Sequence, residues 1–258
     1  MEKSVLEKRI KERLQTKPIL LCSHSVLGYP ALEENPKAIA DFCQAGVDIM
    51  ELQFPFSDPM ADGPILLEAN QKAVKNGVTV DQCFEVSREV IAKNPQTMFL
   101  IMTYYNIVYK RGLSKFAKEA KEAGVLGVII PDLPLEELSA WERACKEHQL
   151  SPILMVTPDT SDKRMQEILK RAMGFIYCVA RKGITGEQSQ FGAEFYAYLE
   201  RVAEHTDLSK GVGFGVRSKE DVSKLIGHAQ IAIVCSKAID ILGKKGSLAA
   251  SKFLKGLR

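Results

Sequence analysis

Two acidic residues, Glu51 and Asp62, have the residue type and the surroundings that proton-transfer chemistry needs. Glu51 lies near the end of the apolar run 47–52, and a carboxyl group partly removed from water suits proton transfer near neutral pH. Asp62 follows in a proline-constrained connection that could fold its carboxylate back over the same strand end. Each also has a structural alternative. Glu51 could be a salt-bridged glutamate, and Asp62 could be a turn or helix-cap aspartate beside Gly63.

A second group of candidates lies later in the chain and suits contact with a substrate or a phosphate. Tyr177 sits within an apolar run, where core packing is the simpler role for a tyrosine. Gly213 and Gly215 form a Gly-x-Gly motif that would let the backbone approach a ligand, or would simply end a strand tightly. Ser236 could cap the following helix, donate to a phosphate, or do both.

Metal and disulfide chemistry have little support in the sequence. The histidines are His24, His148, His205 and His228, and the cysteines are Cys22, Cys43, Cys83, Cys145, Cys178 and Cys235. The histidines show no ligand spacing and the cysteines form no Cys-x-x-Cys pair, so the sequence predicts no metal site and mostly buried, reduced thiols.

Composition favours a small-molecule substrate. The chain has 258 residues, 46% of them hydrophobic, and its 35 basic and 32 acidic residues give a formal charge of +3 without a basic block. A nucleic-acid stripe and a membrane-binding face are therefore not expected. The N-terminal stretch is charged and lacks the apolar region of a signal peptide, which predicts a cytoplasmic protein.

Apolar runs alternate with amphipathic stretches along almost the whole chain, which is typical of repeated βα units. The predicted strands are 18–23, 47–52, 98–103, 125–130, 152–156, 175–179, 211–216 and 231–236. Eight such units, each strand followed by one helix, predict an α/β protein: a single (β/α)₈ barrel domain over 1–258 with an extra N-terminal helix at about 2–14.

The barrel prediction groups the candidates, because barrel enzymes carry their sites at the carboxyl ends of the strands. Glu51, Asp62, Gly213 and Ser236 all lie at such ends. Two long connections, 53–63 and 180–193, also leave this end, and the second has the glycine-rich, polar composition of a mobile lid.

Several long motifs, in order, resemble the tryptophan synthase alpha subunit family. They are ELQFPFSDPMADGP (51–64), YYN (104–106), PDLPLEE (131–137), GFIYCVARKGITG (174–186) and GFG (213–215). The resemblance implies retro-aldol cleavage of indole-3-glycerol phosphate to indole and glyceraldehyde 3-phosphate. It also implies that indole passes to a beta subunit that carries pyridoxal phosphate, within an alpha2beta2 complex. No cofactor or metal would be needed in this chain.

The resemblance also implies roles for single residues. Glu51 would carry out the proton transfers, and Asp62 would hold the indole N–H and its developing positive charge. Tyr177 would lie beside the substrate, and Thr185 would close the lid over it. The family's phosphate contacts match Gly186, Gly213 and Ser236, with Gly215 in the same motif, and the loop with Asp58 and Pro59 would face the beta subunit.

This sequence departs from the family pattern at several positions. The run CSHSVLGYP (22–30) replaces a Thr-Ala-Gly-Asp-Pro-like turn, and single departures are Gln53, Leu67, Arg217, Cys235 and Lys237. Cys235 stands where a phosphate cradle usually has glycine, whereas Arg217 and Lys237 could supply charged phosphate donors.

Three hypotheses of function follow from these matches and departures. One is a working lyase subunit, and the second is a weakened barrel that mainly docks on and activates a beta subunit. The third, another phosphate-binding barrel of indole or histidine metabolism, would not be expected to carry both long loop motifs.

Overall fold

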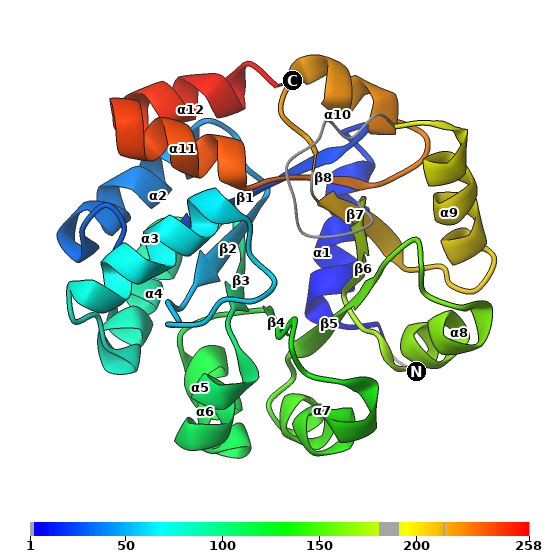
Figure 1. The fold of residues 1–258 in the computed structure, drawn as a ribbon, viewed down its shortest axis with the longest axis horizontal. Helices are drawn as coiled ribbons and strands as arrows, with labels where there is room; N and C mark the ends of the chain where they lie inside the picture. Colours follow the sequence, from blue (N-terminus) through cyan, green and yellow to red (C-terminus); the bar gives the residue numbers. More distant parts are fainter. Residues whose placement is uncertain (1–2, 181–190, 214, 258) are drawn as a thin grey trace.

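Eight parallel strands close into a barrel in the order of the chain (Figure 1). The computed structural model describes residues 3–180, 191–213 and 215–257. The strands are β1 (Leu20–Val26), β2 (Ile49–Gln53), β3 (Met98–Met102), β4 (Gly127–Ile129), β5 (Ser151–Val156), β6 (Phe175–Val179), β7 (Ser209–Gly213) and β8 (Ile231–Val234). The predicted (β/α)₈ barrel and its eight strands are confirmed.

Strand bounds differ from the prediction most in β1 and β7: β1 begins and ends later than 18–23, and β7 begins and ends earlier than 211–216. Strand β1 runs to Val26, so His24 and Ser25, which follow the predicted strand 18–23, lie inside the strand and not in the first loop. Pairing with β2 explains the difference, because Ser23 to Val26 continue the parallel register beside Met50 to Gln53. At the other end of the chain, β8 stops at Val234 because the next helix already begins at Ser236.

Helices form a ring outside the strands (Figure 1). They are α1 (Val5–Leu14), α2 (Asn35–Gln44), α3 (Pro64–Lys75), α4 (Val80–Lys93), α5 (Tyr105–Arg111), α6 (Leu113–Glu122), α7 (Leu138–Glu147), α8 (Asp162–Arg171), α9 (Ala193–Ala203), α10 (Lys219–Leu225), α11 (Ser236–Lys245) and α12 (Ser247–Lys255), with short 3₁₀ turns η1 (Leu32–Glu34) and η2 (Leu135–Glu137). The prediction of one helix per strand was wrong for β2, β3 and β8, each of which is followed by two helices. Among the helices described, none has the length and apolar character needed to cross a membrane.

The exception to the outer ring is α1, which confirms the predicted N-terminal helix. Ser4 caps its first turn by accepting from the Glu7 N–H at 3.2 Å. Its buried side chains, Leu6 and Ile10, join the apolar cluster inside the barrel and not the larger cluster between strands and helices. In Figure 1 α1 accordingly lies within the ring of helices.

A buried carboxylate, Asp48, ties the start of β2 to the segment around α1. It accepts from Arg13 Nη1 at 2.9 Å and from Lys17, and its second oxygen accepts from the Leu21 N–H at 3.0 Å. The Asp48 side chain is fully buried while both cations are partly exposed. This end of the barrel is therefore closed by packing and fixed charges.

Candidate active site

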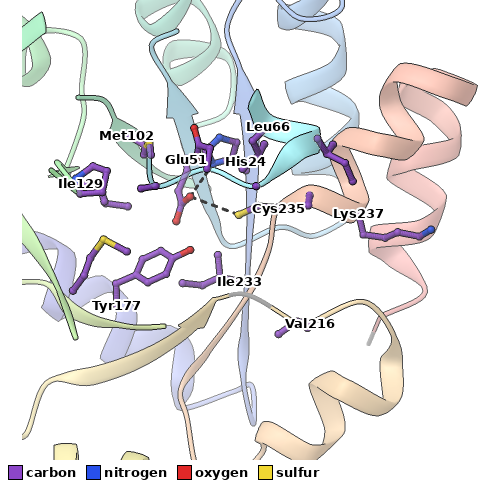
Figure 2. Close-up of a pocket in the computed structure, with 18 of the residues that line it drawn as sticks. His24, Glu51, Leu66, Met102, Ile129, Tyr177, Val216, Ile233, Cys235 and Lys237 are labelled. Atoms are coloured by element: carbon purple, nitrogen blue, oxygen red, sulfur yellow. Dashed lines mark hydrogen bonds and ion pairs between the residues drawn. The ribbon is translucent and has the colours of Figure 1, made fainter. Parts of the chain in front are cut away.

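A cavity of about 320 Å³ opens at the carboxyl end of the strands. Six residues predicted for the site line it, namely Glu51, Asp62, Tyr177, Gly215, Arg217 and Ser236. They come from segments far apart in the sequence, and the closed barrel brings their strand ends together. Apolar side chains such as Met102, Ile129 and Ile233 form the floor beside them (Figure 2).

Glu51 lies on β2 with only 2% of its surface exposed. His24 is its neighbour in the β1–β2 register, and His24 Nδ1 lies 2.9 Å from Glu51 Oε2. Two thiols also face the carboxylate: Cys22 Sγ is 3.5 Å from Oε1 and Cys235 Sγ is 3.8 Å from Oε2. Burial raises the pKa of both thiols well above the usual value, so they stay protonated as donors to Glu51.

Asp62 is held at the cavity by amide donors. Its Oδ2 accepts from Gln53 Nε2 at 2.7 Å and from Asn70 Nδ2 at 3.3 Å. Burial raises the pKa of Asp62, and the hydrogen bond from Gln53 offsets part of that rise. The loop that carries Asp62 is itself fixed, because the Ala61 N–H donates to the Tyr104 hydroxyl at 3.1 Å. Asp62 is therefore placed by its loop and is more than a helix cap.

Tyr177 points its hydroxyl into the cavity from β6 (Figure 2). The ring is 6% exposed, and burial raises the pKa of the phenol well above its usual value, so it remains a neutral hydroxyl. Gly213 on the next strand makes room for it, since a Cβ there would lie 2.3 Å from the Tyr177 hydroxyl. Gly213 thus acts on the site through Tyr177, and it does not itself line the cavity.

The far side of the cavity is formed by the strand 7 and strand 8 ends. Gly215 has φ +104°, a backbone conformation that favours glycine, and Ser236 is the first residue of α11. The Arg217 N–H donates to Asp221 Oδ2 at 2.9 Å, which leaves the exposed guanidinium as the group that could bind an anion. The Lys237 side chain extends away from Glu51 (Figure 2).

The backbone at Cys235 does not require glycine. Its φ of −101° and ψ of −80° are compatible with an L side chain. The thiol is directed toward Glu51, as Figure 2 shows. A Cβ and a thiol at this position remain able to obstruct the close approach of a phosphate.

Other predicted residues lie away from the cavity or outside the described part of the chain. Thr185 and Gly186, with most of the predicted lid, fall in 181–190 and lie outside the described residues. In the connection after β2, Asp58 is exposed but Pro59 is buried. Of these two residues predicted for the partner interface, Asp58 has the more accessible side chain.

Sequence reasoning missed two residues of the site, His24 and Gln53. The histidines show no ligand spacing in the sequence and Gln53 is a departure from the family pattern, yet His24 Nε2 lies 2.7 Å from Gln53 Oε1. The sequence does contain a signal for His24: side chains alternate along a strand, so the residue two positions after the inward-facing Cys22 also faces the inside of the barrel. The predicted strand ends at 23 and leaves His24 in the loop.

One group of donor atoms in this site is close enough to suggest a metal ion. In the described part of the chain, His24, Glu51 and Cys235 offer ligand atoms within 4.8 Å of one another. The 2.9 Å separation between His24 Nδ1 and Glu51 Oε2 is a hydrogen-bond length, shorter than two ligands of one tetrahedral ion would adopt. We therefore describe the group as hydrogen-bonded.

Comparison with known proteins places this site in a family. The family model described as "Tryptophan synthase alpha chain" matches residues 10–255. The chain belongs to the tryptophan synthase alpha chain family. A tryptophan synthase alpha chain of Syntrophotalea carbinolica is 44% identical over 98% of this chain and its own full length, and that of Desulforapulum autotrophicum is equally similar with the same coverage.

Solved structures agree with this membership in the alpha chain family. A structure of tryptophan synthase from M. tuberculosis is similar with a TM-score of 0.91 and 28% identity, covering 99% of this chain and 98% of that chain. The tryptophan synthase a2b2 complex from Pyrococcus furiosus contains a chain similar at a TM-score of 0.85 and 29% identity, covering 93% and 96%. The resemblance seen in the sequence motifs thus extends over nearly the whole alpha chain.

Proposed function

We propose that this chain is a lyase subunit that cleaves indole-3-glycerol phosphate to indole and glyceraldehyde 3-phosphate. The observation that carries the proposal is that Glu51 and Asp62 face one cavity, with the Tyr177 hydroxyl on its wall. Cleavage requires a proton at indole C3, removal of a proton from the glycerol hydroxyl, and a counter-charge for the ring nitrogen. Two carboxylates at one cavity can supply these three functions.

In this proposal Glu51 transfers the protons and Asp62 binds the indole N–H. Two amides already donate to Asp62 Oδ2, so we assign the indole N–H to its other oxygen. The apolar floor of the cavity suits the indole ring, and Tyr177 would lie beside the substrate. None of these steps calls for a metal or an organic cofactor in this chain.

We place the phosphate of the substrate at the strand 7 and strand 8 ends. Gly215, Ser236 and the first amides of α11 can approach an anion there, and the exposed Arg217 can add a charged donor. Thr185 and Gly186 would complete this end from the connection after β6.

The proposed partner is a tryptophan synthase beta subunit that carries pyridoxal phosphate and receives the indole, in an alpha2beta2 complex in the cytoplasm. The loop with Asp58 and Pro59 would face it. Exposed Met60, with 77% of its surface accessible, adds an apolar contact beside Asp58.

The test is an assay of indole release from indole-3-glycerol phosphate, by this chain alone and with a beta subunit. A lyase releases indole in both cases and faster in the complex. Indole release in neither case, together with faster serine chemistry of the beta subunit, would support the alternative of a docking and activating barrel. No response in either assay would contradict both proposals.

A further inference from the structure

An unbroken series of hydrogen bonds joins the two carboxylates of the proposed site. Glu51 Oε2 lies 2.9 Å from His24 Nδ1, and His24 Nε2 lies 2.7 Å from Gln53 Oε1. Gln53 Nε2 then donates to Asp62 Oδ2 at 2.7 Å. His24 is 2% exposed and Gln53 is fully buried, so water does not compete for these bonds. The two residues between the carboxylates are both departures from the family pattern noted in the sequence.

The acceptor role of Asp62 determines which group donates and which accepts in each hydrogen bond of the series. A carboxylate oxygen only accepts hydrogen bonds, and Asp62 Oδ2 receives the amide groups of both Gln53 and Asn70. The NH₂ group of Gln53 must therefore face Asp62, which turns Gln53 Oε1 toward His24. Because that oxygen is an acceptor, His24 Nε2 carries a hydrogen.

With Nε2 protonated, the contact between His24 Nδ1 and Glu51 Oε2 contains one further proton. Without it, a lone pair of the ring would face a carboxylate oxygen at 2.9 Å, which is repulsive. The proton belongs to the pair, either as imidazolium with carboxylate or as neutral imidazole with carboxylic acid.

We propose that His24 is a positioning residue for proton transfer, which shares with Glu51 the proton that reaches the substrate, and that Gln53 orients the ring for this role. The inference rests on the proposed cleavage reaction. Glu51 delivers the shared proton to indole C3, and a C–H bond forms there. The bond from C3 to the glycerol carbon then breaks, its electron pair returning to the ring and its nitrogen. The hydroxyl proton passes to Glu51 as the O–H electron pair becomes the second bond of the aldehyde. The pair ends with one proton, as it began.

The charge state of His24 supports this assignment. Burial alone would lower the pKa of His24, but the hydrogen bond to Glu51, its negative charge and the bond to Gln53 outweigh burial, so the pKa is raised. The protonated form of the pair therefore persists to higher pH than the imidazolium of an ordinary histidine. The proton is lost only as the pH rises through this raised pKa, which gives an alkaline limit to activity.

The other titratable or charged groups around the pair do not account for such a limit. They are Asp62 after β2, Cys22 on β1, Cys235 after β8 and Tyr177 on β6, with the exposed cations Arg217 and Lys237 on the cavity wall. Burial raises the pKa of both thiols and of the phenol well above their usual values, which keeps them neutral. Burial also raises the pKa of the Asp62 carboxyl, and the hydrogen bond from Gln53 offsets part of that rise.

The first experiment measures the proton directly, without any activity. In protein labelled with ¹⁵N-histidine, NMR titration gives the tautomer and the pKa of each of the four rings, and His24→Asn identifies the signal of His24. We expect Nε2 protonated in both charge states and a raised pKa that falls to or below the ordinary histidine value in Glu51→Gln. A pKa of His24 unchanged by Glu51→Gln would overturn the shared proton.

The second experiment follows kcat/KM against pH with the beta subunit present. In His24→Asn the amide nitrogen replaces Nδ1 and still donates to Glu51, but it cannot titrate. We expect a folded protein with kcat/KM about tenfold lower, and with the alkaline limit moved or lost. His24→Phe, which removes both polar atoms, should lose the same limit, and His205→Asn serves as the matched control.

Three results distinguish the possible failures. If His24→Asn keeps the wild-type rate and pH profile, His24 is only structural and the inference fails. If a chelator removes activity and Zn²⁺ restores it, the cluster is a metal centre and the inference also fails. If the wild-type chain releases no indole, the proposed function fails, while the NMR titration still decides whether His24 and Glu51 share a proton.

Discussion

Two buried carboxylates lie close together in the chain, Asp48 immediately before β2 and Glu51 in the middle of β2, and they differ in what surrounds them. Asp48, just before the strand, accepts from Arg13 and Lys17 and is fully buried. Glu51, three residues later, has an equally buried side chain but faces a histidine and two thiols. Arginine and lysine stay charged at neutral pH, whereas histidine can exchange a proton there.

The comparison shows that two buried carboxylates three residues apart have different roles, Asp48 in stability and Glu51 in the proposed chemistry. Asp48 is hydrogen-bonded to two cations and a backbone N–H from neighbouring segments, and this arrangement joins those segments. A carboxylate beside an imidazole can change its charge at little cost, because the proton moves within the pair. This division follows the barrel, whose amino end carries structure and whose carboxyl end carries function.

The largest expected effect comes from packing at the amino end. Ile10 on α1 is fully buried in the cluster inside the barrel, and Ile10→Ala removes three carbons from it. We expect a loss of about 2–5 kcal/mol in the free energy of unfolding, measured by urea denaturation. Activity per folded molecule should stay unchanged, and a lower kcat in the folded protein would break the separation of the two ends.

Glu51→Gln tests the opposite end. The amide keeps the volume of the side chain but cannot carry a proton to the substrate, so kcat/KM should fall by more than roughly 100-fold, which is about 2.7 kcal/mol of barrier. The fold and the affinity for the beta subunit should be retained, as checked by circular dichroism and titration calorimetry. Near-normal turnover in a folded Glu51→Gln protein would remove Glu51 from its proposed role.

Asp48→Asn changes the carboxylate that lies immediately before β2. The amide leaves Arg13 and Lys17 without their negative partner, and we expect a loss of about 1–3 kcal/mol in stability with kcat unchanged. Glu89→Gln is the matched control, because the Glu89–Lys93 pair is exposed and should contribute less than about 1 kcal/mol. Equal losses in the two variants would show that burial at Asp48 adds nothing.

The smallest effects are expected at the phosphate end. Cys235→Gly should raise kcat/KM by a few-fold if the thiol obstructs the phosphate, since glycine permits closer approach, and Arg217→Ser should lower it by about tenfold if the guanidinium binds the phosphate. Steady-state kinetics with indole-3-glycerol phosphate measure both. No change in either variant, from an already high activity, would mean that these departures are neutral.

Much of the fold was predictable because apolar strand and helix patterns repeat with a regular period. The eight strands follow from that pattern, and a barrel then brings Glu51, Asp62 and Tyr177 to one end. The number of helices was harder to predict from the sequence. The second helices after β2, β3 and β8 begin within long amphipathic stretches, and the apolar pattern does not show where one helix ends and the next begins.

The relation between His24, Gln53 and Glu51 could not be predicted in the same way. It depends on the register of β1 against β2, which sets His24 beside Glu51, and a one-residue change would turn the ring to the outside of the barrel. The polar residues His24 and Ser25 resemble the start of a loop, so the apolar pattern does not predict that the strand continues through them. The pairing of β1 with β2 in the folded barrel is what brings His24 into the site beside Glu51.

The position of α1 also bears on the order in which the chain folds. Although α1 precedes every strand, its partners come from much later segments: Arg9 donates to the carbonyl of Pro95, and the Gly174 N–H donates to Glu7. Contacts between residues so distant in sequence form slowly, because long loops must close first. We therefore expect α1 to dock late in folding, after most of the barrel has assembled, and pulsed amide exchange during refolding would show late protection of its N–H groups.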